Sequence, residues 1–194
     1  MKEHSALKNL YKEVVSGIFD WERWGLLSVL SDYVLYYHSG HILEIGCGES
    51  SIHLSKLAEK YNRRVYHVEY SKSGVENMKN TTGYFGKNSE VYTGKSDDFF
   101  NEVKIPKLAL AFIDGDHNYE QAKKDFDNTI RYVIPGGFVF LHDTYPPDMS
   151  WTVPEKCGTV YKLLEELQDN FEETFTFHNS AFDVGLTMVR NYRK

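Results

Sequence analysis

Two short segments place carboxylate and imidazole side chains directly after apolar runs. The segment FIDGDHNYE carries Asp114 and His117 after the run LALAFI, and FLHDT carries His142 and Asp143. If both runs form neighbouring parallel strands, their carboxyl ends lie about 4.8 Å apart at one edge of a sheet. Asp114 and Asp143 can then share a divalent cation, with His142 or Thr144 and water completing the site. Carboxylates with water suit Mg²⁺ or Mn²⁺, and a histidine ligand shifts the preference toward Mn²⁺ or Fe²⁺.

The same segments supply candidates for acid–base chemistry. A histidine side chain can take up a proton near neutral pH, so His117 is a candidate general base. The sequence therefore predicts Asp114 and His117 as catalytic residues and Asp114, His142 and Asp143 as metal ligands. The alternative is structural: the two acids cap loops and helices, and the histidine makes hydrogen bonds within its loop.

A second chemical signal is the glycine-containing segment LEIGCGESS. Gly46 and Gly48 allow a tight turn and a close approach of the backbone to a ligand. A dinucleotide fingerprint needs a third glycine, and Ser51 occupies that position. Glu44 would be unfavourable beside a pyrophosphate but favourable near a sulfonium-bearing amino acid. The segment thus favours S-adenosylmethionine over a dinucleotide, with an ordinary strand–helix turn as the alternative.

Two further positions fit a nucleoside. Glu69 ends the next predicted strand, 23 residues after Gly46, where an acid can accept both ribose hydroxyls. Ser96 and Asp97 follow the third predicted strand, where they can contact an adenine edge, cap a helix, or do both. The predicted cofactor-binding residues are Glu44, Gly46, Gly48, Ser50, Glu69, Ser96, Asp97 and Asp114.

The elements that must position these residues alternate between strands and helices, which predicts parallel pairing. Strands are predicted at 41–46, 63–70, 89–94, 107–114 and 136–143. Helices are predicted at 5–16, 21–37, 50–61, from Ser73, at 96–103, 119–133 and 159–171. Two final strands, at 172–181 and 182–191, join near Asn179-Ser180.

A terminal hairpin on a parallel sheet is typical of the seven-stranded methyltransferase sheet and unusual for a dinucleotide-binding domain. We therefore predict an α/β, Rossmann-like seven-stranded mostly parallel sheet with a C-terminal antiparallel hairpin and helices on both faces. Residues 1–194 are expected to form a single methyltransferase domain. It divides into an N-terminal helical cap at 1–39 and a cofactor-binding core at 40–194.

Composition limits the classes of partner. The chain of 194 residues has a net charge of −6 and no long basic run, which disfavours nucleic-acid binding. Cys47 and Cys157 make neither a disulfide framework nor a zinc pattern. The start of the chain lacks the apolar core of a signal peptide, and LALAFI is too short to span a bilayer. We expect a cytoplasmic protein that binds neither nucleic acid nor membrane.

Taken together, the motifs resemble the class I S-adenosylmethionine-dependent methyltransferases. The chain is most similar to the small-molecule O-methyltransferase group whose fourth strand ends in F-I-D-G-D-H-x-Y. The matching segments are LEIGCGESS, HVEY, FIDGDHNYEQAKKDFDN, VIPGGFVFLHDT and the terminal hairpin, within about residues 40 to 190. The resemblance implies a sheet with a reversed last strand and a cofactor lying over the first two strand ends.

The resemblance also assigns roles. Metal-dependent relatives use an acid after the fourth strand and another after the fifth, which match Asp114 and Asp143. Some relatives use a histidine three residues after the first acid as the base, and His117 matches it. His142 stands where some relatives have an acid, and Thr144 where the catechol-type enzymes have an amide.

The function expected from these observations is S-adenosylmethionine-dependent methylation of a hydroxyl group on a small molecule, with or without a Mg²⁺ or Mn²⁺ ion. Sugars, phenols and natural products are all open as acceptors. The alternatives are a non-catalytic protein that binds S-adenosylmethionine and a nicotinamide-dependent oxidoreductase. The segment at 144–156 can serve either as a lid over the substrate or as a contact in a homodimer.

Overall fold

The computed structural model describes residues 24–82, 86–177 and 184–192. The predicted helix at 5–16 and the predicted turn near Asn179-Ser180 lie outside these residues. Within the described part of the chain, none of the helices combines the length and the apolar character that crossing a bilayer requires.

One seven-stranded sheet organises the chain, in the order β3-β2-β1-β4-β5-β7-β6. Neighbours from β3 to β5 pair in parallel, whereas β7 is antiparallel to both β5 and β6. The predicted fold, including the reversed last strand, is therefore confirmed. The strands are β1 His41–Ile45, β2 Val65–Glu69, β3 Ser89–Thr93, β4 Leu108–Ile113, β5 Val133–Leu141, β6 Thr174–Phe177 and β7 Leu186–Arg190.

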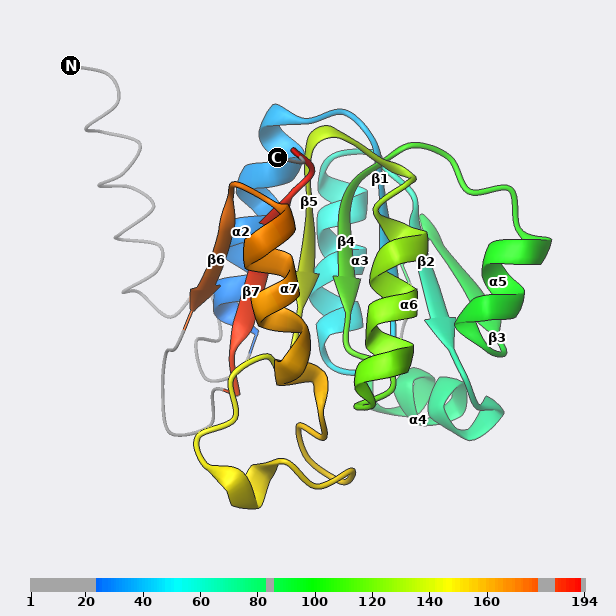
Figure 1. The fold of residues 1–194 in the computed structure, drawn as a ribbon. Coiled ribbons are helices and arrows are strands. Elements are labelled where there is room, and N and C mark those ends of the chain that lie inside the picture. Colours follow the sequence, from blue (N-terminus) through cyan, green and yellow to red (C-terminus); the bar gives the residue numbers. More distant parts are fainter. Residues whose placement is uncertain (1–23, 83–85, 178–183, 193–194) are drawn as a thin grey trace.

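Helices cover both faces of this sheet (Figure 1). One apolar cluster joins α2 (Gly25–Tyr37) and α3 (Ser50–Lys60) to the sheet. The opposite cluster joins α5 (Ser96–Glu102), α6 (Tyr119–Thr129) and α7 (Leu163–Asn170). The helix α4 (Lys72–Thr82) follows β2, and two 3₁₀ turns occupy Met149–Trp151 and Val160–Lys162. The all-buried strand β4 lies between the two apolar clusters, as its continuous apolar run predicts.

Two predicted boundaries were wrong. The helix predicted to run to residue 133 ends at Thr129, and β5 begins at Val133 rather than at Gly136. The pairing of β4 with β5 shifts register between Leu108 and Leu110, and Gly136 has a φ of 82°. Gly136 and Gly137, at which the strand was predicted to begin, therefore lie in an irregularity within β5. Glycine tolerates the positive φ at position 136.

The register brings the carboxyl ends of four strands to one edge. Ile45 pairs with Val68 on one side and with Ile113 on the other, and Ile113 pairs with Leu141. In the sheet order β2, β1, β4 and β5, the residues after these positions are Glu69, Gly46, Asp114 and His142. This edge, at the bottom of Figure 1, is where ligands bind in open parallel sheets.

Candidate functional site

The two glycines of the loop after β1 have different surroundings. Gly46 has a φ of 86°, and a Cβ atom placed on it would lie 2.0 Å from the carbonyl oxygen of Asp114. Glycine is therefore required at position 46, because the ends of β1 and β4 approach each other too closely for a side chain. A Cβ atom on Gly48 would meet no heavy atom within 4 Å. Gly48 borders open space, so it is the glycine that leaves room for a ligand.

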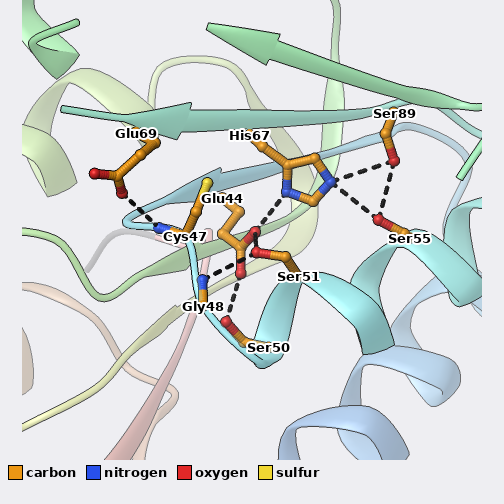
Figure 2. A network of polar contacts seen from close by, with 9 residues as sticks. All are labelled: Glu44, Cys47, Gly48, Ser50, Ser51, Ser55, His67, Glu69 and Ser89. Atoms are coloured by element: carbon orange, nitrogen blue, oxygen red, sulfur yellow. Dashed lines mark hydrogen bonds and ion pairs between the residues drawn. The ribbon is translucent and has the colours of Figure 1, made fainter. Parts of the chain in front are cut away.

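The carboxylate of Glu44 lies on the inner side of this loop, fully buried (Figure 2). Ser50 Oγ donates to its Oε1 at 2.6 Å, and Ser51 Oγ donates to its Oε2 at 2.6 Å. His67 Nδ1 lies 2.5 Å from the same Oε2. Buried charges need such partners. Glu44 and Ser50 were expected to contact the cofactor, but the structure turns both side chains into the protein.

Glu69 lies at the end of β2, beside the outer side of the loop. Its Oε2 accepts from the backbone N–H of Cys47 at 3.2 Å, and its Oε1 accepts from that of Ser71 at 3.0 Å. Gly74 allows this position, because a Cβ atom there would lie 2.3 Å from Glu69 Oε1. Ser71 Oγ also donates to Oε1 at 3.3 Å, so of the roughly four acceptor sites of a carboxylate one remains for a ribose hydroxyl.

Ser96 and Asp97 begin α5 and are used differently. Asp97 Oδ2 pairs with Lys124 Nζ at 2.5 Å, whereas its Oδ1 is buried with no hydrogen-bond partner in the described part of the chain. This unsatisfied acceptor fits a donor such as the exocyclic amine of adenine. Ser96 Oγ donates instead to Asp125 Oδ1 at 2.6 Å. Its hydroxyl is thus turned toward α6.

The sequence analysis did not identify Asp125. Its burial predicts how the stability of the fold depends on pH. It is 1% exposed, and burial raises its pKa to about 6, although hydrogen bonds from Ser96 and Gln121 act in the opposite direction. Because the folded state holds this proton more tightly than the unfolded chain, whose pKa is about 3.9, stability should fall as pH rises from about 4 to 6. Asp125→Asn, which keeps an acceptor oxygen, should therefore be more stable than the wild type at pH 8 by roughly 1–3 kcal/mol.

Urea unfolding at pH 4, 6 and 8 measures this difference. The advantage of Asp125→Asn should be largely lost at pH 4, where the folded wild type is protonated and the unfolded chain is about half protonated. A constant difference at all three pH values would show that the buried charge is not its cause.

The carboxylates and imidazoles expected at the β4 and β5 ends do meet. His142 Nδ1 lies 3.3 Å from Asp114 Oδ1 and 3.4 Å from Asp143 Oδ1, and His117 Nε2 lies 3.1 Å from Asp143 Oδ2. One ligand atom from each of Asp114, His117 and Asp143 lies within 4.8 Å of the others. Two acids with imidazoles on either side form a donor set that suits a divalent cation.

The segment after Asp143 is held by the last strand. Asp143 has a φ of 59°, a left-handed conformation that Asp tolerates better than most residues. The hydroxyl of the buried Thr144 accepts from Thr187 at 2.7 Å, so it faces the sheet rather than the cluster. The backbone N–H of Tyr145 donates to Val184 at 2.7 Å. Thr144, one of the two candidates for a further cation ligand, is therefore not placed for that role.

Trp24 joins the start of α2 to the cluster. Its ring centroid lies 5.1 Å from that of His142 and 5.6 Å from that of Phe112. Burial alone would lower the pKa of His142, but the carboxylates of Asp114 and Asp143 outweigh it and raise that pKa to about 10. The only sequence signal for this contact was the aromatic character of the segment around residue 24.

An open pocket of about 620 Å³ adjoins His117. Thr152 and Pro154, from the segment predicted to be a lid or a dimer contact, line one part of it. The other lining residues are Asp116, Asn118, Glu120, Gln121, Lys124, Gly158 and Thr159. His117 is about one third exposed, so its imidazole can meet a molecule in this pocket.

A second group with metal-binding side chains lies under the glycine loop. Glu44, Cys47 and His67 also offer ligand atoms within 4.8 Å of one another. Burial, with Glu44 and Glu69 nearby, raises the pKa of the Cys47 thiol, which opposes the thiolate that a metal would need. The carboxylate of Glu44 already has three protein partners. The candidate cation site is therefore the one at Asp114 and Asp143.

Comparison with known proteins agrees with this geometry. Residues 43–144 match a family model described as a methyltransferase domain. A probable cobalt-precorrin-6B C(15)-methyltransferase (decarboxylating) from Methanococcus vannielii is 33% identical over 135 residues, which span 68% of this chain and 63% of that relative.

Solved structures share the fold. An O-methyltransferase from Bacillus cereus, in complex with S-adenosylhomocysteine, has a TM-score of 0.63 at 19% identity, over 85% of this chain and 78% of that one. The methyltransferase MycE of the mycinamycin biosynthetic pathway has a TM-score of 0.57 at 19% identity, over 84% and 49%. The family model covers more than half of the chain, including the glycine loop and both carboxylate segments. The chain therefore belongs to the methyltransferase domain family of S-adenosylmethionine-dependent enzymes.

Proposed function

We propose that the protein transfers the methyl group of S-adenosylmethionine to a hydroxyl oxygen of a small molecule. The observation that carries this proposal is the direct contact between two sites. The glycine loop and the Asp114 backbone approach so closely that only glycine fits at Gly46. A donor on the loop and an acceptor at the carboxylate cluster would therefore lie side by side, and such positioning alone can lower a barrier by about 7–11 kcal/mol.

Three groups are free to hold the donor. Gly48 borders open space, Glu69 keeps acceptor capacity for the ribose, and Asp97 presents an unsatisfied oxygen for the adenine amine. A nicotinamide cofactor is disfavoured, because the pyrophosphate fingerprint lacks its third glycine at Ser51.

The acceptor side combines a cation site with a base. Asp114 and Asp143 would hold Mg²⁺ or Mn²⁺ with His142 as a third ligand, since His142 Nδ1 lies 3.3 Å from Asp114 Oδ1 and 3.4 Å from Asp143 Oδ1. Such a cation, when bound, lowers the pKa of a hydroxyl beside it.

His117 is the residue that would take the acceptor proton. Its Nε2 is oriented by Asp143 Oδ2 at 3.1 Å, which leaves Nδ1 to receive the proton. The acceptor oxygen would form its bond to the methyl carbon as the carbon–sulfur bond breaks, in line, giving a methyl ether and S-adenosylhomocysteine. His117 would keep the proton until solvent removes it.

The acceptor class proposed is a sugar, a phenol or a natural product. The pocket beside His117 is lined mainly by polar side chains together with Pro154, which suits a hydroxylated molecule with an apolar part. The MycE structure contains Mg, S-adenosylhomocysteine and mycinamycin VI, which is a combination of ligands of the kind proposed here.

Calorimetric titration with S-adenosylhomocysteine tests the donor assignment, with NADH as the control ligand and with Mg²⁺ or Mn²⁺ titrated separately. We expect binding of S-adenosylhomocysteine with a Kd in the micromolar range and no heat from NADH. Binding of NADH instead would overturn the proposal. Binding of S-adenosylhomocysteine without turnover of any hydroxyl acceptor in a broad panel would instead favour a non-catalytic donor-binding protein.

Glu69→Ala should weaken S-adenosylhomocysteine binding about 10- to 100-fold, because hydrogen bonds to a carboxylate are worth about 1.5–3 kcal/mol. The heat of cation binding should not change, since Glu69 lies on β2, away from the cluster. Glu90→Ala is the matched control: it removes a carboxylate from β3 that pairs with the exposed Arg64. Equal donor affinity of both variants would remove Glu69 from the donor site.

A further inference from the structure

His67 is a fully buried imidazole in the middle of β2, and the proposed reaction does not use it. In the sheet register it pairs with Glu44 of the neighbouring strand β1. Both strands are otherwise apolar at buried positions, so a histidine beside a glutamate is costly there unless the two side chains satisfy each other.

The contacts of His67 form one continuous path to the glycine loop (Figure 2). His67 Nε2 lies 3.1 Å from Ser55 Oγ and 3.3 Å from Ser89 Oγ, while its Nδ1 lies 2.5 Å from Glu44 Oε2. Glu44 in turn accepts from Ser51 Oγ at 2.6 Å. Ser51 Oγ then accepts from the backbone N–H of Gly48 at 3.2 Å.

The end point of this path suggests its purpose. Glu44 also accepts from Ser50 at 2.6 Å, so its two oxygens hold the first two residues of α3. Those residues directly follow the loop in which Gly48 borders open space. A network that served stability alone could be replaced by apolar side chains of similar volume. This one ends on the backbone that would face the donor.

We propose that His67 is a positioning residue for the methyl donor: through Glu44 it fixes Ser50, Ser51 and the Gly48 turn in the shape that binds S-adenosylmethionine. This inference rests on the proposed function, because it assigns the donor to that turn. The carboxylate of Glu44 then holds the loop through its hydrogen bonds on the buried side, and neither Glu44 nor His67 would contact the donor.

Two substitutions test the contacts of the two ring nitrogens of His67 separately. His67→Asn places an amide N–H near the position of Nδ1, so it can still donate to Glu44. His67→Gln places its amide near the position of Nε2, so it keeps the contacts to Ser55 and Ser89 and leaves Glu44 without this donor. Val65→Ala, on the same strand and also buried against α3, is the control for lost stability alone.

The measurements are the Kd of S-adenosylhomocysteine, the KM for the donor, kcat at saturating donor, and Tm. We expect His67→Gln to raise both Kd and KM about tenfold or more, the change that follows from losing a charge-assisted hydrogen bond, with kcat nearly unchanged. His67→Asn should stay within about threefold of the wild-type Kd. Val65→Ala should lower Tm without changing Kd.

Equal Kd values for His67→Gln and His67→Asn would overturn the inference, as would Kd changes that follow Tm in all three variants. If His67→Gln does not fold, Ser51→Ala breaks the same path nearer the loop and leaves the sheet intact. An unchanged Kd for Ser51→Ala would then contradict the proposal. Failure of the wild type to bind S-adenosylhomocysteine would instead refute the proposed function, and this inference with it.

Discussion

Asp114→Asn is expected to reduce methyl transfer about 10³-fold while leaving the affinity for S-adenosylhomocysteine, measured without added cation, close to that of the wild type. The substitution removes one of two negative charges that face His142 and His117, and with it the charge that would hold a divalent cation. General base catalysis contributes about 10²–10⁴-fold, and a cation stabilises charge in the transition state by several kcal/mol. Steady-state kinetics with Mn²⁺, together with calorimetry of Mn²⁺ and of S-adenosylhomocysteine, measures both effects.

Asp127→Asn is the matched control, because it makes the same change on α6, outside the carboxylate cluster and the pocket beside His117. The carboxylate of Asp127 pairs with Lys123 at 3.3 Å. It should retain activity. His117→Ala should lose turnover but keep the heat of cation binding, which separates the base from the cation ligands. Full activity of Asp114→Asn on a true acceptor would mean that no cation at this site takes part in the reaction.

Gly46→Ala is expected to destabilise the fold more than any other single change at the loop. The added Cβ atom would lie 2.0 Å from the carbonyl oxygen of Asp114, at a φ of 86°. Overpacking costs about 1–3 kcal/mol, and the left-handed conformation adds about 1–2 kcal/mol. The expected loss of roughly 2–5 kcal/mol is a large share of a typical stability of about 5–15 kcal/mol.

Gly48→Ala gives the contrasting result, because its Cβ atom would meet nothing within 4 Å. Its stability should stay within about 1 kcal/mol of the wild type. Its affinity for S-adenosylhomocysteine should fall, since the new methyl group enters the space assigned to the donor. Urea unfolding and calorimetry compare the two variants. Similar stabilities for Gly46→Ala and Gly48→Ala would contradict the crowding between the β1 and β4 ends.

The sheet and its carboxyl edge followed from the sequence because they depend on local patterns. Apolar runs alternate with amphipathic segments, so the strands that place Asp114, His142 and Asp143 at one edge could be predicted. The start of β5 could not, because the irregularity around Gly136 depends on pairing with β4. Propensity alone does not reveal a register shift.

The direction of side chains was harder to predict than their position. Glu44 was correctly placed before the loop, but its orientation depends on His67, which becomes its neighbour only through the β1–β2 register. The polar residue in the middle of each apolar strand is the signal that indicates pairing between the two. Trp24 and Asp125 carried no such signal, since their contacts with His142 and Ser96 arise only when distant segments fold together.

The junction between β1 and β4 has a thermodynamic consequence. The backbone N–H of Asp114 donates to the carbonyl of Ile45 at 2.8 Å, one residue before the glycine that packs against Asp114 itself. A ligand that moves the loop must therefore move the start of the cation site, and the reverse holds as well. Linkage then requires that donor and cation change each other's affinity by the same factor. The two sites would behave as one cooperative unit, in which each ligand prepares the backbone for the other.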